Sequence, residues 1–360
     1  MGRSPLVTGP FAVGVTRPDV ESQWSEPEHV AASPIRPCVR VWYPADPDAL
    51  PAGSASHWWH ELRRVADSRR DLAAPDLPFA AGSARYPLVI YFPGWPGTRI
   101  ENYGLINELA SQGFIVAGVI YPARGPNLSP AAFDRQVTEL EQPMDYSSEA
   151  AYRRTQAEGT ARVRARAADA IRLLDAVARV QPLARWIDMS RIGIVGFSLG
   201  GAVAAEASTL DPRFGAVVNI DGRHWDRALE RGVSQPYLFI GEELPMPTEA
   251  DLQATDPNRR YNAIEDHRDY SQLALNLRRH GGMQVVVSGA RHAHFTDGGG
   301  HSGVRRLTHA GERSAARRVL KILHAYVPAF FRLILKSEPS PLLLPGARPF
   351  ANAHLQVWER

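Results

Sequence analysis

Short apolar runs alternate along this chain with longer segments in which apolar residues recur every three or four positions. The runs predict strands that are buried on both faces, at residues 88–92, 114–120, 192–195, 215–220, 236–240 and 283–287. The periodic segments predict helices, over about 101–112, 148–180, 259–279 and 312–335. Strands that alternate with helices favour an α/β fold, in which a mostly parallel sheet is covered on both faces.

The remaining segments predict additions to a single domain over residues 1–336. Residues 39–44 alternate between apolar and polar side chains, so the first 45 residues are expected to supply antiparallel edge strands. Residues 46–84 have the composition of an insertion, with a short helix expected at Trp58–Leu62. Residues 122–147 resemble a lid, and the Pro/Leu-rich residues 337–360 are expected to form a tail that wraps the surface.

Composition and charge limit which binding partners and which cellular compartment are expected for the protein. The 360 residues are 44% hydrophobic with a formal net charge of +3, which argues against nucleic acid as the main partner. The arginines of the helix predicted over 148–180 indicate a solvated face; they are Arg153, Arg154, Arg162, Arg164 and Arg166. With Cys38 as the only cysteine, no intrachain disulfide is possible. No run reaches the roughly 18 apolar residues that span a bilayer, and no signal peptide is recognisable, so a cytoplasmic location without a transmembrane segment is expected.

A glycine-rich sequence directly follows one of the apolar runs. Residues 196–201 read Gly-Phe-Ser-Leu-Gly-Gly, after the strand predicted over 192–195 and before an Ala-rich helix. In this setting a G-x-S-x-G sequence places its serine on a sharp turn, and the glycines let strand and helix pass closely. The helix N-terminus also favours developing negative charge. The motif predicts Ser198 as a catalytic nucleophile, and the alternative is a turn that only packs.

A serine nucleophile needs a base and an acid that orients the base. In sheet enzymes of this type both follow the serine along the chain, on loops at the carboxyl ends of later strands. Asp221 directly follows one predicted strand, and His292 and His294 follow the last one. Glu242 and Glu243, one strand after Asp221, are rival acids. We favour Asp221 because it stands immediately at the strand end as a short carboxylate.

The His-x-His spacing also raises the alternative of a metal site. His292 and His294 stand two residues apart, with Asp297 and His301 nearby. No further ligand motif stands out, and a metal site would leave the Ser198 turn unexplained. We therefore expect neither metal nor cofactor.

The groups that would bind an oxyanion and the substrate are expected around the same turn. One oxyanion donor should be the N–H of Leu199, and a second should come from Gly94, Trp95 or Gly97, because Pro93 and Pro96 have no N–H. The substrate entrance is expected to be apolar and bulky, lined by Trp95, Phe197, Leu199, Trp225 and Phe295. Arg223 and Arg291 stand beside the predicted catalytic loops and could attract an anionic group.

Several of these segments together resemble the plasma-type platelet-activating factor acetylhydrolases and their bacterial relatives, within the α/β-hydrolase superfamily. The resemblance spans about residues 9–300 and is carried by residues 9–14, 86–94, 109–117 and 196–201, Asp221, His292 and 295–297. It implies Ser198 as nucleophile, Asp221 as acid and His292 as base, with Trp95 and Leu199 as oxyanion donors. Phe197 and Pro93 replace histidines usual in the family, which makes the entrance more apolar.

The function expected from all of this is hydrolysis of a carboxylic ester through an acyl-serine intermediate. The substrate would be a small-molecule or lipid ester, with a short acyl group or of phospholipid type, so that lipid degradation is the expected process. Within the class, a cutinase-like or a dienelactone-type hydrolase is the alternative. From another class, the alternative is a non-catalytic binding protein on an α/β-hydrolase scaffold.

Overall fold

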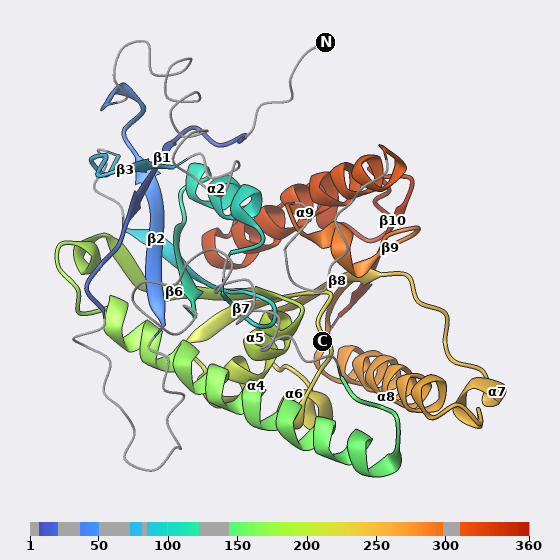
Figure 1. Cartoon of the computed structure of the whole chain (residues 1–360). Coiled ribbons are helices and arrows are strands. Elements are labelled where there is room, and N and C mark those ends of the chain that lie inside the picture. Colours follow the sequence, from blue (N-terminus) through green and yellow to red (C-terminus); the bar gives the residue numbers. More distant parts are fainter. Residues whose placement is uncertain are drawn as a thin grey trace.

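The fold is built on one ten-stranded sheet with the strand order β10-β9-β8-β7-β6-β4-β5-β2-β1-β3. The structure is a computed structural model, which describes residues 7–20, 37–49, 73–80, 85–98, 100–121, 144–297 and 310–359. Figure 1 shows the sheet crossing the molecule with helices on both sides of it. This is the α/β architecture that the alternation of apolar runs and periodic segments predicts.

The six central strands form the parallel part of the sheet. They are β5 (Ile115–Ile120), β4 (Tyr86–Phe92), β6 (Ile187–Phe197), β7 (Phe214–Ile220), β8 (Tyr237–Glu242) and β9 (Gly282–Val287). Each pairs in parallel with its neighbour. All seven residues of β4 are buried, as expected for a strand covered on both faces. Because the strands are parallel, their carboxyl ends meet at one edge of the sheet, where binding sites of such sheets lie.

The early strands form the antiparallel edge that the sequence predicts. β1 (Ala12–Thr16) pairs antiparallel with β2 (Cys38–Ala45), and β2 pairs antiparallel with β5. The short β3 (Ala74–Pro75) adds to β1 in parallel, so part of the expected insertion extends the sheet. The helix expected at residues 58–62 and most of the expected lid lie outside the described residues.

Two sets of helices cover the two faces. α2 (Tyr103–Ser111) and α9 (Ala310–Lys336) enclose one apolar core, which contains Phe114, Phe330 and Phe331. α4 (Glu149–Val177), α5 (Leu199–Leu210), α6 (Asp226–Arg231) and α8 (Pro257–His280) pack on the other face. Within the described residues, the remaining short helices are η2 (Pro47–Ala49), η3 (Leu183–Trp186), α7 (Glu249–Leu252), η4 (His292–Phe295) and η5 (Pro341–Leu343).

The C-terminal segment differs from the surface tail that was expected. Residues Ala353–Trp358 form β10, which pairs antiparallel with β9 along six residues. Ala353 is buried, and polar and apolar side chains alternate along the residues that follow it, as on an edge strand with one covered face. The last part of residues 337–360 therefore belongs to the sheet and closes its edge.

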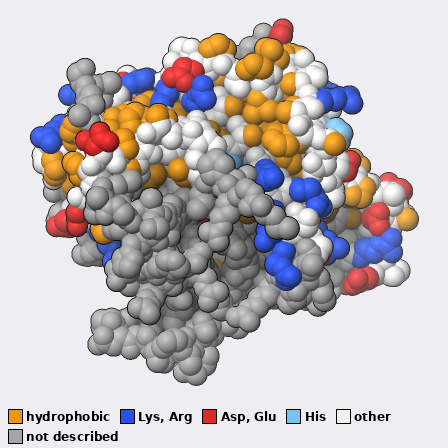
Figure 2. Space-filling model, turned by 90° about the horizontal axis from the view of Figure 1, so that it is seen from above, with side chains coloured by type: hydrophobic (Ala, Val, Ile, Leu, Met, Phe, Trp, Pro, Cys, Tyr) orange, Lys and Arg blue, Asp and Glu red, His pale blue; other side chains and the backbone are white. Residues whose placement is uncertain are grey.

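Charge is distributed in small groups over the surface that Figure 2 presents. Apolar side chains of the described residues form broad areas there, and basic and acidic side chains lie in smaller groups beside them. Among the described residues, no helix is both long enough and apolar enough to cross a bilayer.

Candidate active site

Ser198 occupies a sharp turn between β6 and α5. Its backbone has φ 54° and ψ −120°, an unusual conformation for a residue with a side chain. Its N–H donates to the carbonyl oxygen of Ile220 on the neighbouring strand at 2.8 Å. A Cβ at Gly196 would lie 2.0 Å from the carbonyl oxygen of Gly200, and one at Gly200 would lie 2.1 Å from that of Phe92. The glycines are therefore required by the close approach of strand and helix.

Asp221 is held at the carboxyl end of β7, next to that turn. It also has a positive φ, 52°, and its N–H donates to the carbonyl oxygen of Ile240 at 2.8 Å. Its side chain is 7% exposed, and each carboxylate oxygen has a partner. Oδ1 accepts the N–H of Glu242 at 2.9 Å, and Oδ2 lies 2.6 Å from Nδ1 of His292. These two contacts fix the direction in which the carboxylate faces.

His292 lies in η4, after β9, and contacts both other residues. Its Nε2 lies 3.0 Å from Oγ of Ser198, and its ring stacks on Phe197 with centroids 4.8 Å apart. Burial by itself lowers the pKa of His292, but the hydrogen bond to Asp221 and the negative charges of Asp221 and Glu242 outweigh burial, so that the pKa is raised. The arrangement can pass a proton from the Ser198 hydroxyl to an imidazole that a carboxylate orients.

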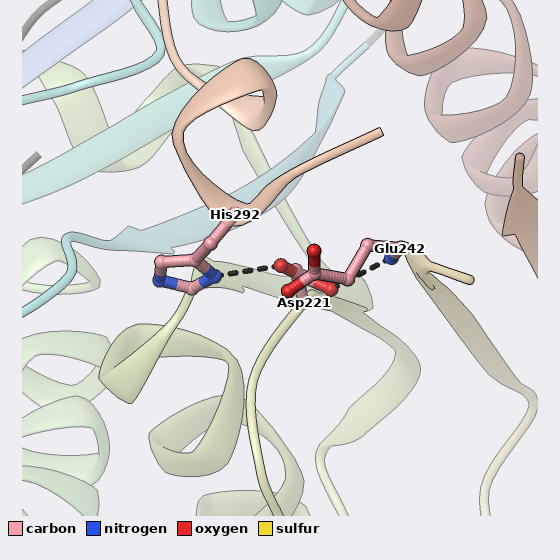
Figure 3. Close-up of side chains that lie close together, drawn as sticks. All are labelled: Asp221, Glu242 and His292. Atoms are coloured by element: carbon pink, nitrogen blue, oxygen red, sulfur yellow. Dashed lines mark hydrogen bonds and ion pairs between the residues drawn. The ribbon is translucent and has the colours of Figure 1, made fainter. Parts of the chain in front are cut away.

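Glu242, the rival acid, lies beside the same imidazole. Figure 3 shows its side chain next to Asp221, but the carboxylate that accepts the hydrogen bond of the ring is that of Asp221. Ligand atoms of Asp221, Glu242 and His292 lie within 4.8 Å of one another. Burial and the charge of Asp221 raise the pKa of Glu242 to about 7, although His292 acts in the opposite direction. Glu243 is exposed.

The second histidine and Asp297 have other partners. His294 is 2% exposed, its Nε2 lies 2.8 Å from Oε2 of Glu312 on α9, and its Nδ1 accepts the N–H of Arg291. Asp297 accepts the N–H of Gly104 at 2.7 Å. The described members of the alternative metal set therefore do not converge, and His301 lies outside the described residues. Among the described residues, the one group of three with converging ligand atoms is Asp221, Glu242 and His292.

The loop after β4 lies against the nucleophile. A Cβ on Gly94 would be 3.4 Å from Cβ of Ser198. Trp95 is partly exposed, and the guanidinium groups of Arg162 and Arg166 lie over its ring at 4.5 and 5.0 Å. This places the expected oxyanion loop beside Ser198, with Leu199 following on the other side as the first residue of α5.

Arg166 does not lie on a solvated face, although such a face was predicted for the arginines of this helix. It is 8% exposed, its Nη2 donates to the carbonyl oxygen of Pro96 at 2.6 Å, and its guanidinium lies 4.2 Å from the ring of Tyr121. Burial lowers its pKa, although Tyr121 and Asp169 act in the opposite direction. Arg166 therefore braces the loop that carries Trp95. The sequence signal was its place among apolar residues of α4, between Val163 and Ala167.

The residues expected at the entrance divide into two groups. Phe197, 4% exposed, contacts His292, and Leu199 packs against a small cluster of Val163, Ala202 and Trp225, in which Trp225 is 6% exposed. Phe295 is fully buried in the core beneath α9 and is not part of an open entrance, which corrects the prediction.

The two arginines expected at the site also differ from each other. Arg223 pairs with Asp266 on α8 and donates to the hydroxyl of Tyr146. Arg291 has a side chain that is 74% exposed and pairs with Glu312. Arg223 is therefore held close to the site, whereas Arg291 lies at the surface.

Comparison with known proteins places this geometry in context. A family model described as "Platelet-activating factor acetylhydrolase, isoform II" matches residues 3–297. Proteins named platelet-activating factor acetylhydrolase from Gallus gallus and Canis lupus familiaris are 27% and 26% identical over 191 and 181 residues. Each alignment covers 44% of this chain, and 44% and 40% of the respective relative, so the chain spans less than half the length of these relatives.

A solved structure matches the whole fold. It is the ferulic acid esterase from Streptomyces cinnamoneus, with a TM-score of 0.62 and 24% identity, over 99% of this chain and 98% of that one. The chain therefore has the α/β-hydrolase fold.

Proposed function

Because the chain belongs to the platelet-activating factor acetylhydrolase, isoform II family, we propose that it is a serine carboxylic-ester hydrolase that acts through an acyl-serine intermediate. One observation carries the proposal. Ser198 Oγ lies 3.0 Å from Nε2 of His292, whose Nδ1 lies 2.6 Å from Oδ2 of Asp221. A serine hydroxyl is a weak nucleophile until a base takes its proton, and this relay supplies the base and its orienting carboxylate.

In the acylation step, Ser198 Oγ attacks the ester carbonyl carbon while Nε2 of His292 takes the hydroxyl proton. The imidazolium that forms is stabilised by the carboxylate of Asp221. The tetrahedral intermediate carries a negative oxygen. It collapses when the ester C–O bond breaks, and His292 returns the proton to the departing alkoxide. The acyl group is then bound to Ser198.

In the deacylation step, His292 takes a proton from water, and the hydroxide formed attacks the acyl-serine carbonyl. The second tetrahedral intermediate collapses when the bond between its carbon and Ser198 Oγ breaks; His292 returns its proton to Oγ, and the carboxylic acid is released. In both intermediates the N–H groups of Trp95 and Leu199 are the proposed oxyanion donors. The approach of the Gly94 loop to Ser198 and the position of Leu199 at the start of α5 support them.

We expect a short-acyl ester, such as an acetyl ester, as substrate. The acetylhydrolase names of the relatives support a small acyl group, and the bulky apolar side chains of Phe197, Trp95 and Trp225 around the turn support limited space. Arg223 supports an anionic group on the alcohol side, as in a phospholipid, because it is held near the base by Asp266. Lipid degradation and a cytoplasmic location stay predictions.

The test of this proposal is hydrolysis of p-nitrophenyl acetate by wild type and by Ser198→Ala. We expect the variant to keep its fold, measured by circular dichroism and Tm, and to lose about 10⁴- to 10⁶-fold in kcat. Ser190→Ala, at an exposed serine of the same strand, is the matched control and should keep wild-type activity. A folded Ser198→Ala protein with near-normal turnover would contradict the proposal.

A further inference from the structure

Glu242 has two separate connections to the proposed relay. Through its main-chain N–H it donates to Oδ1 of Asp221, on the opposite side of the carboxylate from His292. Through its side chain it brings a second carboxylate to the same place, with an oxygen within 4.8 Å of the facing atoms of Asp221 and His292. The mechanism above uses only the first carboxylate, so the second one has no assigned role.

A second carboxylate at this distance acts on the imidazole through its charge. An opposite charge within about 4–6 Å favours the charged form of a group by roughly one to three pKa units. In agreement with this, Glu242 contributes to raising the pKa of His292. In return, burial and the like charge of Asp221 raise the pKa of Glu242 to about 7. The charge of Glu242 and the charge of His292 therefore influence each other.

Other charged and titratable groups face the Glu242–His292 pair from the end of β7 and from α8. Apart from the pair itself, they are Asp221, Arg223, Asp266 and Tyr270. Arg223 lowers the pKa of His292, but its guanidinium is bound by Asp266. Burial, with the surrounding negative charges, raises the pKa of Tyr270 beyond its ordinary range, so that Tyr270 stays neutral. Glu242, whose pKa is raised to about 7, and His292, whose pKa is raised, are therefore the two coupled groups of this cluster.

We propose that Glu242 acts on the reaction through His292. Its carboxylate places a second negative charge beside the imidazole and so determines the pH above which His292 is a base. The inference rests on the proposed function, because it concerns the same base. The main-chain N–H of Glu242 positions Asp221, and the side chain of Glu242 sets the pH at which His292 loses its proton. Residues with only a structural role would hold the loop without changing the titration of the base.

The sign of the effect follows from the charge. The negative charge of Glu242 favours imidazolium, so it keeps His292 protonated to higher pH. Glu242→Gln retains the shape and an oxygen acceptor but removes the charge. His292 then loses its proton at lower pH, and the acid limb of kcat/KM moves to lower pH by about one unit. The plateau of kcat/KM changes by less than about threefold, since Asp221 still orients the ring.

The experiment is kcat/KM for p-nitrophenyl acetate, measured between about pH 4 and about pH 9, where the acid limb reports ionisation of the free enzyme. Glu243→Gln is the matched control, because it removes one negative charge from the adjacent, exposed position. Glu242→Asp retains the charge. We expect the acid limb of Glu242→Gln to move down by about one unit, and those of Glu243→Gln and Glu242→Asp to stay within about 0.3 unit of wild type.

Two outcomes would overturn the inference. One is an acid limb of Glu242→Gln that coincides with that of Glu243→Gln. The other is a Glu242→Asp limb that moves as far as that of Glu242→Gln, because loss of shape rather than of charge would then be responsible. In either case an active wild type leaves the proposed function intact, whereas a wild type with no esterase activity at any pH would remove the proposed function itself.

Discussion

Replacing Asp221 with asparagine tests the orientation of the base. In the wild type, Oδ1 of Asp221 accepts the N–H of Glu242 and Oδ2 faces Nδ1 of His292. An asparagine has one oxygen and one NH₂ group, and its oxygen is needed by the Glu242 N–H. The NH₂ group therefore faces His292, which must place its proton on Nε2 instead of Nδ1. Nε2, 3.0 Å from Ser198 Oγ, can then no longer accept the serine proton.

The expected magnitude follows from the population of this tautomer. The side chain of Asp221 is only 7% exposed, so water cannot easily replace the lost interaction. For a triad carboxylate, the loss of the correct tautomer lowers kcat by about 10⁴, which corresponds to about 5.4 kcal/mol of activation free energy. The packing barely changes, because asparagine and aspartate have almost the same shape. Tm should therefore stay close to that of wild type.

The assay is kcat for p-nitrophenyl acetate at neutral pH in Asp221→Asn, Glu242→Gln and Glu243→Gln. We expect a loss of about 10⁴ in the first variant and less than about threefold in the other two. The opposite ranking, with Glu242→Gln inactive and Asp221→Asn active, would refute the reasoning and move the acid to the end of β8.

Four other outcomes are expected at the same site. His292→Gln should approach the loss in kcat of the nucleophile variant. His294→Gln should keep most activity but lose about 1–3 kcal/mol of unfolding free energy in urea, because it disrupts a buried contact with Glu312; an inactive His294→Gln beside an active His292→Gln would reverse the two roles. Arg166→Met should lower kcat by about tenfold or more, with a smaller effect on KM, because the Pro96 carbonyl loses its buried donor and the oxyanion loop loosens; unchanged kcat would contradict the bracing role. Among p-nitrophenyl esters of graded length, kcat/KM should be highest at roughly two to six acyl carbons, since each buried CH₂ adds about 0.8 kcal/mol only until the pocket is full; a profile still rising at about ten carbons would contradict a short pocket.

The central strands and the three predicted relay residues could be inferred from the sequence because two simple regularities combine. Continuous apolar runs such as residues 88–92 are typical of strands buried on both faces. Parallel strands bring their carboxyl ends to one edge, so Ser198, Asp221 and the loop after residue 287 are expected to meet there. The structure brings these three side chains within hydrogen-bonding distance.

Other features depend on information that the local sequence does not contain. The direction of the loop after β9 decides that Phe295 enters the core and that His294 faces Glu312 on α9. The approach of Glu242 to His292 depends on the pairing of β7 with β8, and that of Arg166 to Pro96 on the position of α4. β10 did leave a signal, because apolar Ala353, Leu355 and Val357 alternate with polar residues, but the proline-rich segment before it suggested a tail.

Covalent labelling of the nucleophile tests the central claim most directly. Wild type, Ser198→Ala and His292→Gln would each be treated with a fluorophosphonate, and the adduct would be located by peptide mass spectrometry. We predict one adduct per chain, on Ser198, absent in Ser198→Ala and formed at least about 100-fold more slowly in His292→Gln, because the serine then lacks its base. Labelling at another residue, or equal labelling of wild type and Ser198→Ala, would contradict the account.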